Sequence, residues 1–555
     1  MPFSSRWSLD IPDISIPSFI FGSSSAAILP DKGPLFIDAK RPDINFTHHS
    51  YREFAKRLAV GLIDAGLKTG DRVMLFSGNH IFSPIVIMGT VMAGGVYNST
   101  NPGYMPHEVA YQLKTCQPTF LLVADNCLER ALKGADMVGF NKKQIYQFGD
   151  PQSKTDSSIR SWAQLIASPE RGAKYQWEEL NTPESSTRTA ILIFSSGTTG
   201  LPKGVEISHR NLVANVSQLL KMQTLSNSAP DPSSVWRRRG LCCLPMYHAL
   251  GLTFYNFVAP KGDIQVYIME RYKLDDVLQH IQDYKISELV MVPPMVLGFA
   301  KHPQITKYDL KSVRKVMVGA APLGIELTAQ FESIWNGDVR IRQVWGMSEQ
   351  PCMVTAWHED ENNAPASTSV GELLPGCDAM LMRPDGTEET RPNQRGEIWI
   401  RGPNMMKGYW NNATATKAAM TDGWLMSGDI AYFDEKRKFY IVDRIKELIK
   451  VRGAQVAPAE LEALLLENEH VRDAAVIGVK TATEDEDPRA YIVPEDKKKV
   501  APKDIESWIN SRVSKQKRIT GGVLFVDSIP KNPSGKILRR FLREHAAKDS
   551  KQSKL

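Results

Sequence analysis

A loop of glycines, hydroxyl residues and one lysine constrains this chain more than any other feature. It reads SSGTTGLPKG over residues 195–204 and follows an apolar run at residues 190–194 that predicts a buried strand. Ser208 predicts the N-cap of a helix beginning near His209, so the loop is expected between ordered elements. The glycines allow backbone N–H groups to point into one concavity, the hydroxyls add donors, and Lys203 adds positive charge. The segment therefore predicts a cradle for a polyphosphate.

The spacing of this loop excludes a P-loop. The pattern G-x-x-x-x-G-K-[ST] requires a hydroxyl directly after the lysine, and Gly204 stands there instead. By composition alone, an ordinary surface turn rich in glycine, serine and threonine remains the alternative. Motifs farther along the chain favour the phosphate cradle.

Length and charge favour a multidomain enzyme with small anionic ligands. At 555 residues the chain is long enough for several domains. Its 68 basic and 62 acidic residues are spread along the chain, and the net charge of +6 suggests anionic ligands rather than a nucleic-acid surface. The basic cluster at residues 236–239 is better explained as a solvated loop than as a site for a phosphate-bearing substrate.

The cysteines and the chain ends bear on localisation. Six cysteines without a C-x-x-C pair predict neither a zinc site nor a disulfide framework, which favours a reducing compartment. The N-terminus lacks a basic region followed by a clean apolar core, so we do not expect a secreted protein. Polar residues and Pro84 interrupt the most apolar window, at residues 73–97, so we expect no membrane span. The last tripeptide, Ser553-Lys554-Leu555, matches the peroxisomal address S-K-L. We therefore expect a peroxisomal protein whose tail is read by the import receptor.

The order of predicted elements indicates α/β layers through about residue 440. Residues 264–268 and 288–292 predict strands, residues 274–284 predict a helix between them, and Pro293-Pro294 predicts a turn. After residue 443 the pattern changes to a small α+β module. Its expected helices lie near residues 459–467 and 504–513, its strands near 474–479, 489–493 and 523–526, and an acidic loop at 481–488.

Three further motifs carry residues suited to nucleotide chemistry. Residues 530–536, PKNPSGK, set Lys536 on a turn that can project into another domain, although a surface lysine is the simpler reading of that motif alone. Residues 343–349, QVWGMSE, combine an aromatic face for a purine with a carboxylate for Mg²⁺, with a core tryptophan as the alternative. Asp429 suits a ribose diol, and Arg444 suits the same sugar or its phosphate.

Taken in order, these motifs resemble the signature of the adenylate-forming, or AMP-binding, superfamily. The chain is similar to its acyl-CoA ligases over nearly the whole length, and most resembles 4-coumarate-CoA ligases, their peroxisomal fungal relatives and beetle luciferase. The resemblance rests on SSGTTGLPKGV at residues 195–205, WGMSE at 345–349, SGDI at 427–430 and DRIKELIKVRGAQVAPAELE at 443–462. It implies that a carboxylate attacks the α-phosphate of Mg-ATP, releasing pyrophosphate, and that the thiol of coenzyme A then displaces AMP.

The resemblance also implies the fold class and the domains. The implied fold is α/β, with a large N-terminal domain of two doubly wound subdomains plus a β-barrel, and a small mobile α+β C-terminal domain. Residues 1–442 would form the adenylation domain that binds ATP and the acid, residues 443–446 the hinge, residues 447–547 the C-terminal domain, and residues 548–555 the tail with the peroxisomal signal.

Site residues follow from the positions that match the family motifs. The implied catalytic residues are Lys536 for the first step, Lys450 for the second, His248 in the acid pocket and Lys446 at the hinge. The implied contacts of ATP or AMP are Ser195, Ser196, Gly197, Thr198, Thr199, Lys203, Ala321, Gln343, Trp345 on adenine, Ser348, and Asp429 with Arg444 on ribose, while Glu349 binds Mg²⁺. Arg271, Arg452 and Gly453 would contact coenzyme A, and the acid pocket would be lined by His248, Leu250, Gly319, Val344 and Gln455.

Departures from the family pattern bear on the acid. Leu250 lies where plant hydroxycinnamate ligases have a tyrosine, and Val344 replaces a pocket glycine. An apolar wall cannot hydrogen-bond a phenol, and burying that group unpaired costs roughly 1–3 kcal/mol. We expect a medium-chain aliphatic or simple aryl acid, with 4-coumarate as the alternative. Trp345, Ser348 and Arg452 replace tyrosine, threonine and lysine and retain the relevant chemistry.

Other functions on the same fold remain as alternatives. A stand-alone amino-acid-adenylating enzyme is disfavoured, because residues 245–251 contain no acidic side chain for an α-amino group and no carrier domain follows Lys536. Luciferase-type oxidation shares the fold and the peroxisomal address. A catalytically silent nucleotide-binding scaffold is disfavoured by the intact lysines.

Overall fold

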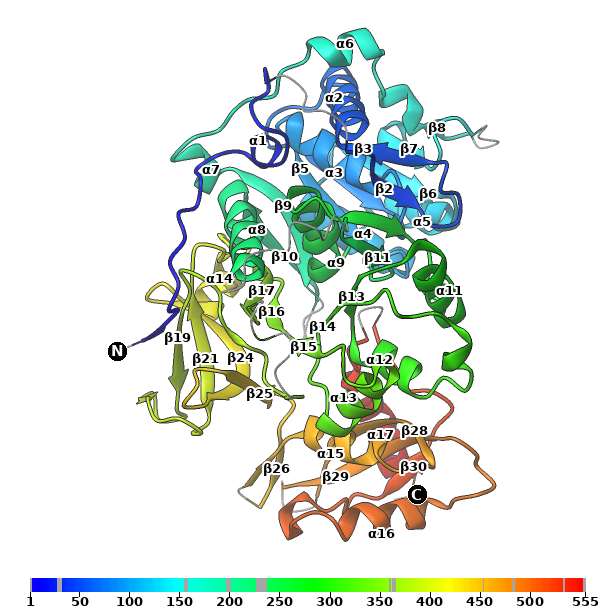
Figure 1. Cartoon of the computed structure of the whole chain (residues 1–555), viewed down its shortest axis with the longest axis vertical. Helices are drawn as coiled ribbons and strands as arrows, with labels where there is room; N and C mark the ends of the chain where they lie inside the picture. The colour runs from blue at the N-terminus through cyan, green and yellow to red at the C-terminus, as the bar shows by residue number, and fades with distance from the viewer. Residues whose placement is uncertain are drawn as a thin grey trace.

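The structure is a computed structural model of the chain (Figure 1). It describes residues 2–26, 32–153, 158–195, 201–225, 237–358, 361, 366–452, 454–481, 485–532 and 535–552. Outside the described residues lie several predicted positions: Ser196, Gly197, Thr198, Thr199, Gly453 and Ser553-Lys554-Leu555.

Two mainly parallel sheets form the N-terminal part. The first follows the order β22 (Gly408–Tyr409), β10 (Lys203–Ser208), β9 (Thr189–Ser195), β5 (Val96–Thr100), β4 (Arg72–Phe76), β6 (Phe120–Ala124), β7 (Ile145–Phe148) and β8 (Arg160–Ser161). Strands β4 to β9 pair in parallel, whereas β10 and β22 are antiparallel additions at one edge. The central strands are buried along most of their length, as parallel strands covered on both faces require; β4, β6 and β9 are mainly apolar, whereas β5 also buries Asn98, Ser99 and Thr100.

The second sheet contains the strands that were predicted around residues 264–292. Its order is β15 (Ile341–Gln343), β14 (Lys315–Val318), β13 (Glu288–Met291), β11 (Arg239–Cys242), β12 (Gln265–Ile268), β2 (Pro34–Asp38) and β3 (Asn45–Thr47). All neighbours pair in parallel except β2 and β3. The strands β12 and β13 and the helix between them confirm the alternation seen in the sequence.

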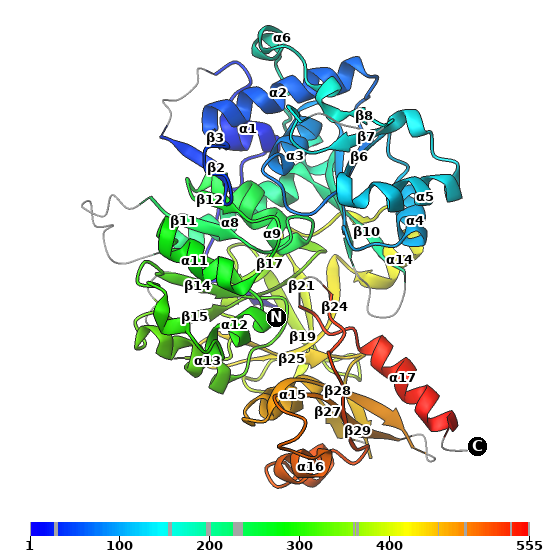
Figure 2. The ribbon, with the colours of Figure 1, turned by 90° about the vertical axis from the view of Figure 1, so that its right-hand side faces the viewer.

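Helices connect and cover these two sheets (Figures 1 and 2). They are α1 (Ile16–Phe21), α2 (His48–Asp64), α3 (Ser83–Met92), α4 (Pro106–Cys116), α5 (Leu128–Val138), α6 (Pro169–Lys174), α7 (Glu184–Thr187), α8 (His209–Thr224), α9 (Ala249–Thr253), α10 (Ala259–Lys261), α11 (Leu274–Tyr284), α12 (Pro293–Ala300) and α13 (Ile325–Glu332). Ser208 caps α8 as predicted, because its side chain accepts a hydrogen bond from the backbone N–H of Asn211. The predicted turn at Pro293-Pro294 is wrong: both prolines lie in the first turn of α12, where the missing N–H costs no helical hydrogen bond.

Antiparallel strands form the third part, where the resemblance implies a β-barrel. The main sheet follows the order β1 (Phe3–Ser4), β19 (Asp378–Met382), β21 (Gly396–Arg401), β24 (Trp424–Phe433) and β23 (Met420–Thr421), with β20 (Glu388–Glu389) on β19 and β25 (Phe439–Arg444) on β24. A smaller sheet contains β16 (Trp345–Met347), β17 (Gln350–Ala356) and β18 (Glu372–Leu373). A bridge between Gly371 and Phe439 joins the two sheets. Helix α14 (Ala413–Ala419) lies between β22 and β23 in sequence.

The C-terminal part is the small α+β module predicted from the sequence. It contains the hairpin β26 (Ile449–Val451) and β27 (Ala454–Val456), the sheet β28 (Val471–Lys480), β29 (Glu486–Pro494) and β30 (Val523–Phe525), and the helices α15 (Pro458–Leu466), α16 (Pro502–Asn510) and α17 (Arg539–Gln552). The acidic loop is shorter than predicted, because β29 already begins at Glu486, which pairs with Lys480 at the end of β28.

The clusters of buried hydrophobic side chains support the division into a large and a small domain, because none of them contains buried residues of both. Two clusters lie between Ile16 and Phe439, and two lie between Ile449 and Ala546. Figures 1 and 2 both place the C-terminal module against the end of the molecule formed by α12 and α13. The boundaries at residues 442 and 446 stay a prediction. Within the described part of the chain, no helix is both long and apolar enough to span a bilayer.

Candidate active site

A cavity of about 730 Å³ lies where the two parallel sheets, the antiparallel sheet and the C-terminal module meet. It is lined by elements far apart in sequence, including the ends of β9 and β14 and the turn before α17. Many of the predicted site residues line it: Ser195, Lys203, His248, Leu250, Gly319, Val344, Ser348, Glu349, Arg444, Lys446 and Lys536.

The two strands that flank the glycine-rich loop in sequence form a hairpin at one wall of this cavity. Ser195 ends β9, Lys203 begins β10, and the antiparallel register places these two residues directly opposite each other. The ammonium of Lys203 lies 4.7 Å from the centre of the Tyr409 ring, and the Tyr409 hydroxyl donates a hydrogen bond to Glu349 Oε1 at 2.8 Å. A cation and a carboxylate are therefore held side by side, at a wall whose polar groups suit phosphate oxygens and a divalent cation.

Tyr409 was not found by sequence reasoning. It belongs to β22, which pairs with β10 and so brings residue 409 beside residue 203. Burial, together with the neighbouring Glu349 carboxylate, raises the pKa of Tyr409, so its hydroxyl stays a proton donor at neutral pH. The sequence around Tyr409 offers little to identify it beyond the glycine that precedes it. That residue, Gly408, has a backbone φ of 155°, which residues other than glycine rarely adopt.

Asp429 and Trp345 form a buried pair beside the cavity. The indole N–H of Trp345 donates to Asp429 Oδ2 at 2.8 Å, and Arg444 Nε lies 3.3 Å from Asp429 Oδ1. Asp429 Oδ1 is buried and accepts no hydrogen bond from the described residues. A buried carboxylate oxygen of this kind suits a ligand hydroxyl. Trp345 itself is buried, and its backbone N–H donates to the hydroxyl of Thr355.

Lys536 reaches the cavity from a tight turn in front of α17. Gly535 has a φ of 80°, and a Cβ on it would lie 3.0 Å from two ring carbons of Pro294 in α12, so the turn needs a glycine to approach the large domain this closely. The backbone N–H of Lys536 donates to Asn532 Oδ1 at 2.8 Å. Burial, and then the Arg444 guanidinium, lower the pKa of Lys536 to about 8.

The predicted acid-pocket residues Leu250, Gly319 and Val344 meet at one end of the cavity. A Cβ on Gly319 would lie 3.2 Å from Val344 Cγ2 and 3.7 Å from Leu250 Cδ2. His248 precedes α9, and its Nε2 is buried without a hydrogen-bond partner among the described residues. Burial lowers the pKa of His248 to about 4, so the imidazole is neutral at physiological pH. This end of the cavity is apolar, with one neutral polar group.

Some predicted residues lie outside the main cavity. The amide of Gln343 is occupied by the backbone of Leu323 and Ser367, so Gln343 holds the neighbouring loop rather than facing the cavity, and Ala321 lines an adjoining cavity at the domain junction. Arg271 lines another adjoining cavity of about 480 Å³, which shares Asn532 with the main one.

The hairpin of β26 and β27 carries three predicted residues that do not line the main cavity in this domain arrangement. Lys450 and Gln455 are paired across the hairpin and are exposed, and Arg452 lies at its tip with a φ of 49°. Their predicted contacts with the adenylate, the coenzyme or the acid require another orientation of the C-terminal module and stay a prediction.

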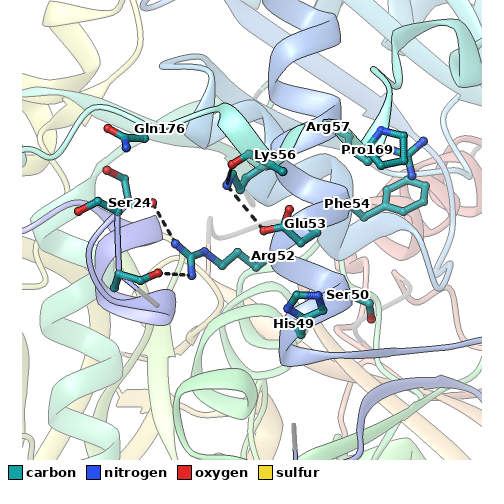
Figure 3. A pocket seen from close by; sticks show the side chains of 13 residues that line it. Ser24, His49, Ser50, Arg52, Glu53, Phe54, Lys56, Arg57, Pro169 and Gln176 are labelled. Carbon is teal, nitrogen blue, oxygen red and sulfur yellow. Dashed lines mark hydrogen bonds and ion pairs between the residues drawn. The ribbon is translucent and has the colours of Figure 1, made fainter. Parts of the chain in front are cut away.

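A second large cavity, of about 740 Å³, lies near α2, and its lining includes several charged residues (Figure 3). Its cations are already engaged in holding the chain together. Arg52 donates to the backbone carbonyls of Ser23, Ser24 and Ala26, and Lys56 donates to Ala173 O while lying 3.6 Å from Glu53. None of the predicted site residues lines this cavity.

Comparison with known proteins agrees with the geometry. The model of the AMP-binding enzyme family matches residues 25–410, and the model of the AMP-binding enzyme C-terminal domain matches residues 460–536. The chain belongs to the AMP-binding enzyme family. A phenylacetyl-CoA ligase of Aspergillus niger is 37% identical over 98% of this chain and 99% of its own length. A peroxisomal OPC-8:0-CoA ligase of Arabidopsis thaliana is 33% identical over 97% of this chain and 94% of its own length.

Solved structures support the fold of this AMP-binding enzyme. The ATP-bound MatB from Rhodopseudomonas palustris has a TM-score of 0.81 with 24% identity, covering 96% of this chain and 98% of its own. An anthranilate CoA ligase in complex with anthranoyl-AMP has a TM-score of 0.82 with 19% identity, covering 97% and 98% of the two chains. At these identities the likeness bears on the fold alone.

We predict that Gly346→Ala damages the nucleotide side of the site. A Cβ at position 346 would lie 2.0 Å from the backbone oxygen of Cys352, so β16 and β17 would have to separate and Trp345 and Ser348 would move. Overpacking of this kind costs about 1–3 kcal/mol. We expect a lower melting temperature and at least tenfold weaker AMP binding by calorimetry.

The matched control is Gly149→Ala, since a Cβ at position 149 meets no atom within 4 Å. Unchanged stability and AMP affinity in Gly346→Ala would contradict the prediction.

Proposed function

We propose that this protein is an ATP-dependent acid–CoA ligase that forms an acyl-adenylate and then the coenzyme A thioester, releasing pyrophosphate and AMP. The observation that carries the proposal is the position of Lys536, which lines the same cavity as Lys203, Glu349 and the apolar pocket. A nucleotide and an acid placed in this cavity would lie beside a buried cation.

In the first step, a carboxylate oxygen of the acid bonds to the α-phosphorus of ATP and the bond to pyrophosphate breaks. Lys536 and Lys203 would neutralise the crowded phosphate oxygens as charge shifts to the leaving group. Ser195, Ser196, Gly197, Thr198 and Thr199 would add donors from the loop. Glu349, already fixed by Tyr409, offers the carboxylate oxygen that Mg²⁺ prefers, and bound Mg²⁺ would supply further charge at the phosphates.

The buried pair of Asp429 and Trp345 would hold the nucleoside. Asp429 Oδ1, which accepts no hydrogen bond from the described residues, suits a ribose hydroxyl, and Arg444 would add a donor to the same sugar. The hydrogen bond from Trp345 fixes the Asp429 carboxylate and orients the indole, on which adenine would stack beside Ser348 and Ala321. Gln343 would act by shaping the loop at residues 320–323.

In the second step, the thiol of coenzyme A attacks the acyl carbon and AMP leaves. The cavity that contains Arg271 and adjoins the main one offers a place for the coenzyme. We propose that residues 443–446 act as a hinge at Lys446, so that the C-terminal module withdraws Lys536 and presents Lys450, Arg452, Gly453 and Gln455.

The acid is proposed to be apolar along the part bound by Leu250, Gly319 and Val344. His248 is neutral, so it can accept or donate a hydrogen bond without adding charge to this pocket. The relationship to a phenylacetyl-CoA ligase supports an acid without a phenol. Relatives named as probable 4-coumarate–CoA ligases, from Dictyostelium discoideum, keep hydroxycinnamates as the alternative.

We propose a peroxisomal location. The tripeptide Ser553-Lys554-Leu555 would be read by the import receptor, and the Arabidopsis relative named as peroxisomal supports this location.

The two lysines of the C-terminal module should separate the half-reactions. Lys536→Ala is expected to lower acid-dependent exchange of labelled pyrophosphate into ATP by at least a hundredfold, while thioester formation from supplied acyl-adenylate keeps most of its rate. Lys450→Ala should show the opposite pattern, because Lys450 lies away from the cavity in this arrangement. Lys497→Ala, an exposed lysine of the same module, is the matched control. Equal losses in both half-reactions for Lys536→Ala would refute this division.

The pH dependence of adenylation should follow the protonation state of Lys536. Since its pKa is about 8, the cation is present below that pH and is lost as the pH rises through it. We therefore expect kcat/KM for ATP to fall above about pH 8, because this parameter reports groups of the free enzyme. In Lys536→Arg this falling limb should vanish, since arginine keeps its charge. If kcat/KM of Lys536→Arg still fell at the same pH, the fall would have to be caused by a titrating group other than Lys536.

A screen of acids tests the substrate class. Coenzyme-A-dependent AMP release should favour phenylacetate and octanoate over 4-coumarate by about tenfold, since an unpaired buried hydroxyl costs about 1–3 kcal/mol. Leu250→Tyr should narrow this difference in rate by offering the phenol hydroxyl a hydrogen-bond partner.

A clear preference of the unmodified enzyme for 4-coumarate would overturn the proposed substrate class. AMP release with no acid present would overturn the proposed ligase function. Light emission from luciferin, ATP and oxygen would instead indicate a luciferase.

A further inference from the structure

Lys301 connects the large domain to the C-terminal module by polar contacts. It directly follows α12, and its backbone N–H donates to Leu297 O, so the residue is fixed to that helix. Its ammonium donates to the backbone carbonyl of Val471 in the module at 2.6 Å and lies 3.7 Å from the Glu495 carboxylate. A hydrogen bond from a cation is stronger than one between neutral groups. These contacts therefore favour the docked arrangement of the two domains.

Strand register explains why both partners of Lys301 lie at one point of the module. Val471 begins β28, and its pairing partner is Pro494, the last residue of β29. Glu495 follows directly, so the carbonyl of Val471 and the carboxylate of Glu495 are presented together at this end of the strand pair. Figure 1 shows the module lying against α12 and α13.

Strand β28 also supports the turn that ends at Lys536. Asp473, near the start of the strand, accepts hydrogen bonds from Lys531 at 2.7 and 2.8 Å. Lys531 lies at the beginning of the turn and pairs with Ile537 at its end. Because the base of the turn is bound to β28, a contact that fixes β28 against the large domain also fixes the position of Lys536.

Two contacts with the module lie at opposite ends of α12. At the N-terminal end Pro294 meets Gly535, and at the C-terminal end Lys301 binds the module. Along the helix these two positions lie ~10 Å apart, at about 1.5 Å per residue. Phe299 of α12 is fully buried in the core of the large domain, so the helix stays with that domain. Two separated contacts on one fixed helix oppose rotation of the module.

The charges at the junction make the contacts of Lys301 matter. Burial lowers the pKa of Lys301, and the Glu495 carboxylate opposes this shift, so the ion pair offsets part of the desolvation of the ammonium. Burial, and then the neighbouring Glu326 carboxylate of α13, raise the pKa of Glu467 in the module. Two carboxylates therefore lie together across the junction, which favours separation of the domains when both are charged. The attraction at Lys301 opposes this repulsion.

We propose that Lys301 is a positioning residue for the first half-reaction: through Val471 and Glu495 it holds the C-terminal module docked, and so keeps Lys536 in the main cavity. This inference rests on the proposed ligase function and on its hinge movement. Lys301 is not among the described residues that line the main cavity, so it acts on the chemistry only through Lys536.

The experiment measures the two half-reactions separately in the full-length enzyme, with phenylacetate and with octanoate. Lys301→Met keeps the length of the side chain but removes its charge and its donor. The docked fraction should then fall, and kcat for acid-dependent exchange of labelled pyrophosphate into ATP should drop about tenfold. Thioester formation from the supplied acyl-adenylate should keep its rate, because that step does not need the docked arrangement.

Two further variants accompany this measurement. Lys301→Arg keeps the charge and the donor, so it should retain most of the exchange rate. Lys311→Met, at an exposed lysine between α12 and β14, is the matched control and should leave both half-reactions unchanged.

A crosslink tests whether Lys301 acts through docking. A Cβ on Gly324, which precedes α13, would lie 3.1 Å from Ala463 Cβ on α15, close to the range of about 3.5–4.5 Å found in disulfides. Oxidation of the Gly324→Cys, Ala463→Cys variant should therefore lock the docked arrangement. In the oxidised variant Lys301→Met should no longer lower exchange, and reduction should restore the loss. If the crosslink does not form, the comparison of the half-reactions alone decides.

Three results would overturn the inference and leave the ligase function intact. They are an unchanged exchange rate in Lys301→Met, equal losses in both half-reactions, and a loss of exchange that persists in the oxidised variant. Absence of exchange in the unmodified enzyme with every acid tested would instead overturn the proposed function.

Discussion

The position of one buried cation depends on how the large and the small domain meet. Lys536 belongs to the C-terminal module, yet it lines a cavity formed mainly by the large domain. The turn that carries it is fixed from behind by Arg539, which donates to both carboxylate oxygens of Glu462 at 2.7 Å and to the backbone of β28. On the side that faces the large domain, the turn is held by the close approach of Gly535 to Pro294. The lysine is thus held by packing on both sides, and the surrounding site is complete only while the two domains are docked in this way.

The remaining residues gather because parallel strands end at a common edge. Ser195 ends β9, Gly319 follows β14 and Val344 follows β15, so side chains from both sheets reach the same cavity. Ligand sites of open α/β sheets lie at the carboxyl ends of their strands for this reason. The antiparallel part adds what the strand ends do not provide: the carboxylates of Glu349 and Asp429, each oriented by a hydrogen bond from an aromatic side chain.

Sequence reasoning was strongest where a local pattern determines local structure. The strand before Ser195, the cap at Ser208 and the helix at residues 274–284 follow from periodicity and capping, and the structure confirms them. Contacts between distant segments could not be predicted in this way. Tyr409 reaches Lys203 only through the pairing of β22 with β10, and Gln343 turns to the backbone of Leu323 because the loop after β14 folds beside it.

The electrostatics of Lys536 suggest how chemistry and domain movement are coupled. A lysine whose pKa falls from 10.5 to about 8 is disfavoured as a cation in this cavity by roughly 3 kcal/mol. The phosphate oxygens of ATP would offset this cost and so favour the docked arrangement of the domains. Once pyrophosphate has left, the adenylate offers a single phosphate, and much of that compensation is lost. In the proposed mechanism, the same desolvation would therefore favour withdrawal of Lys536 after the first step, which would let the thiol enter.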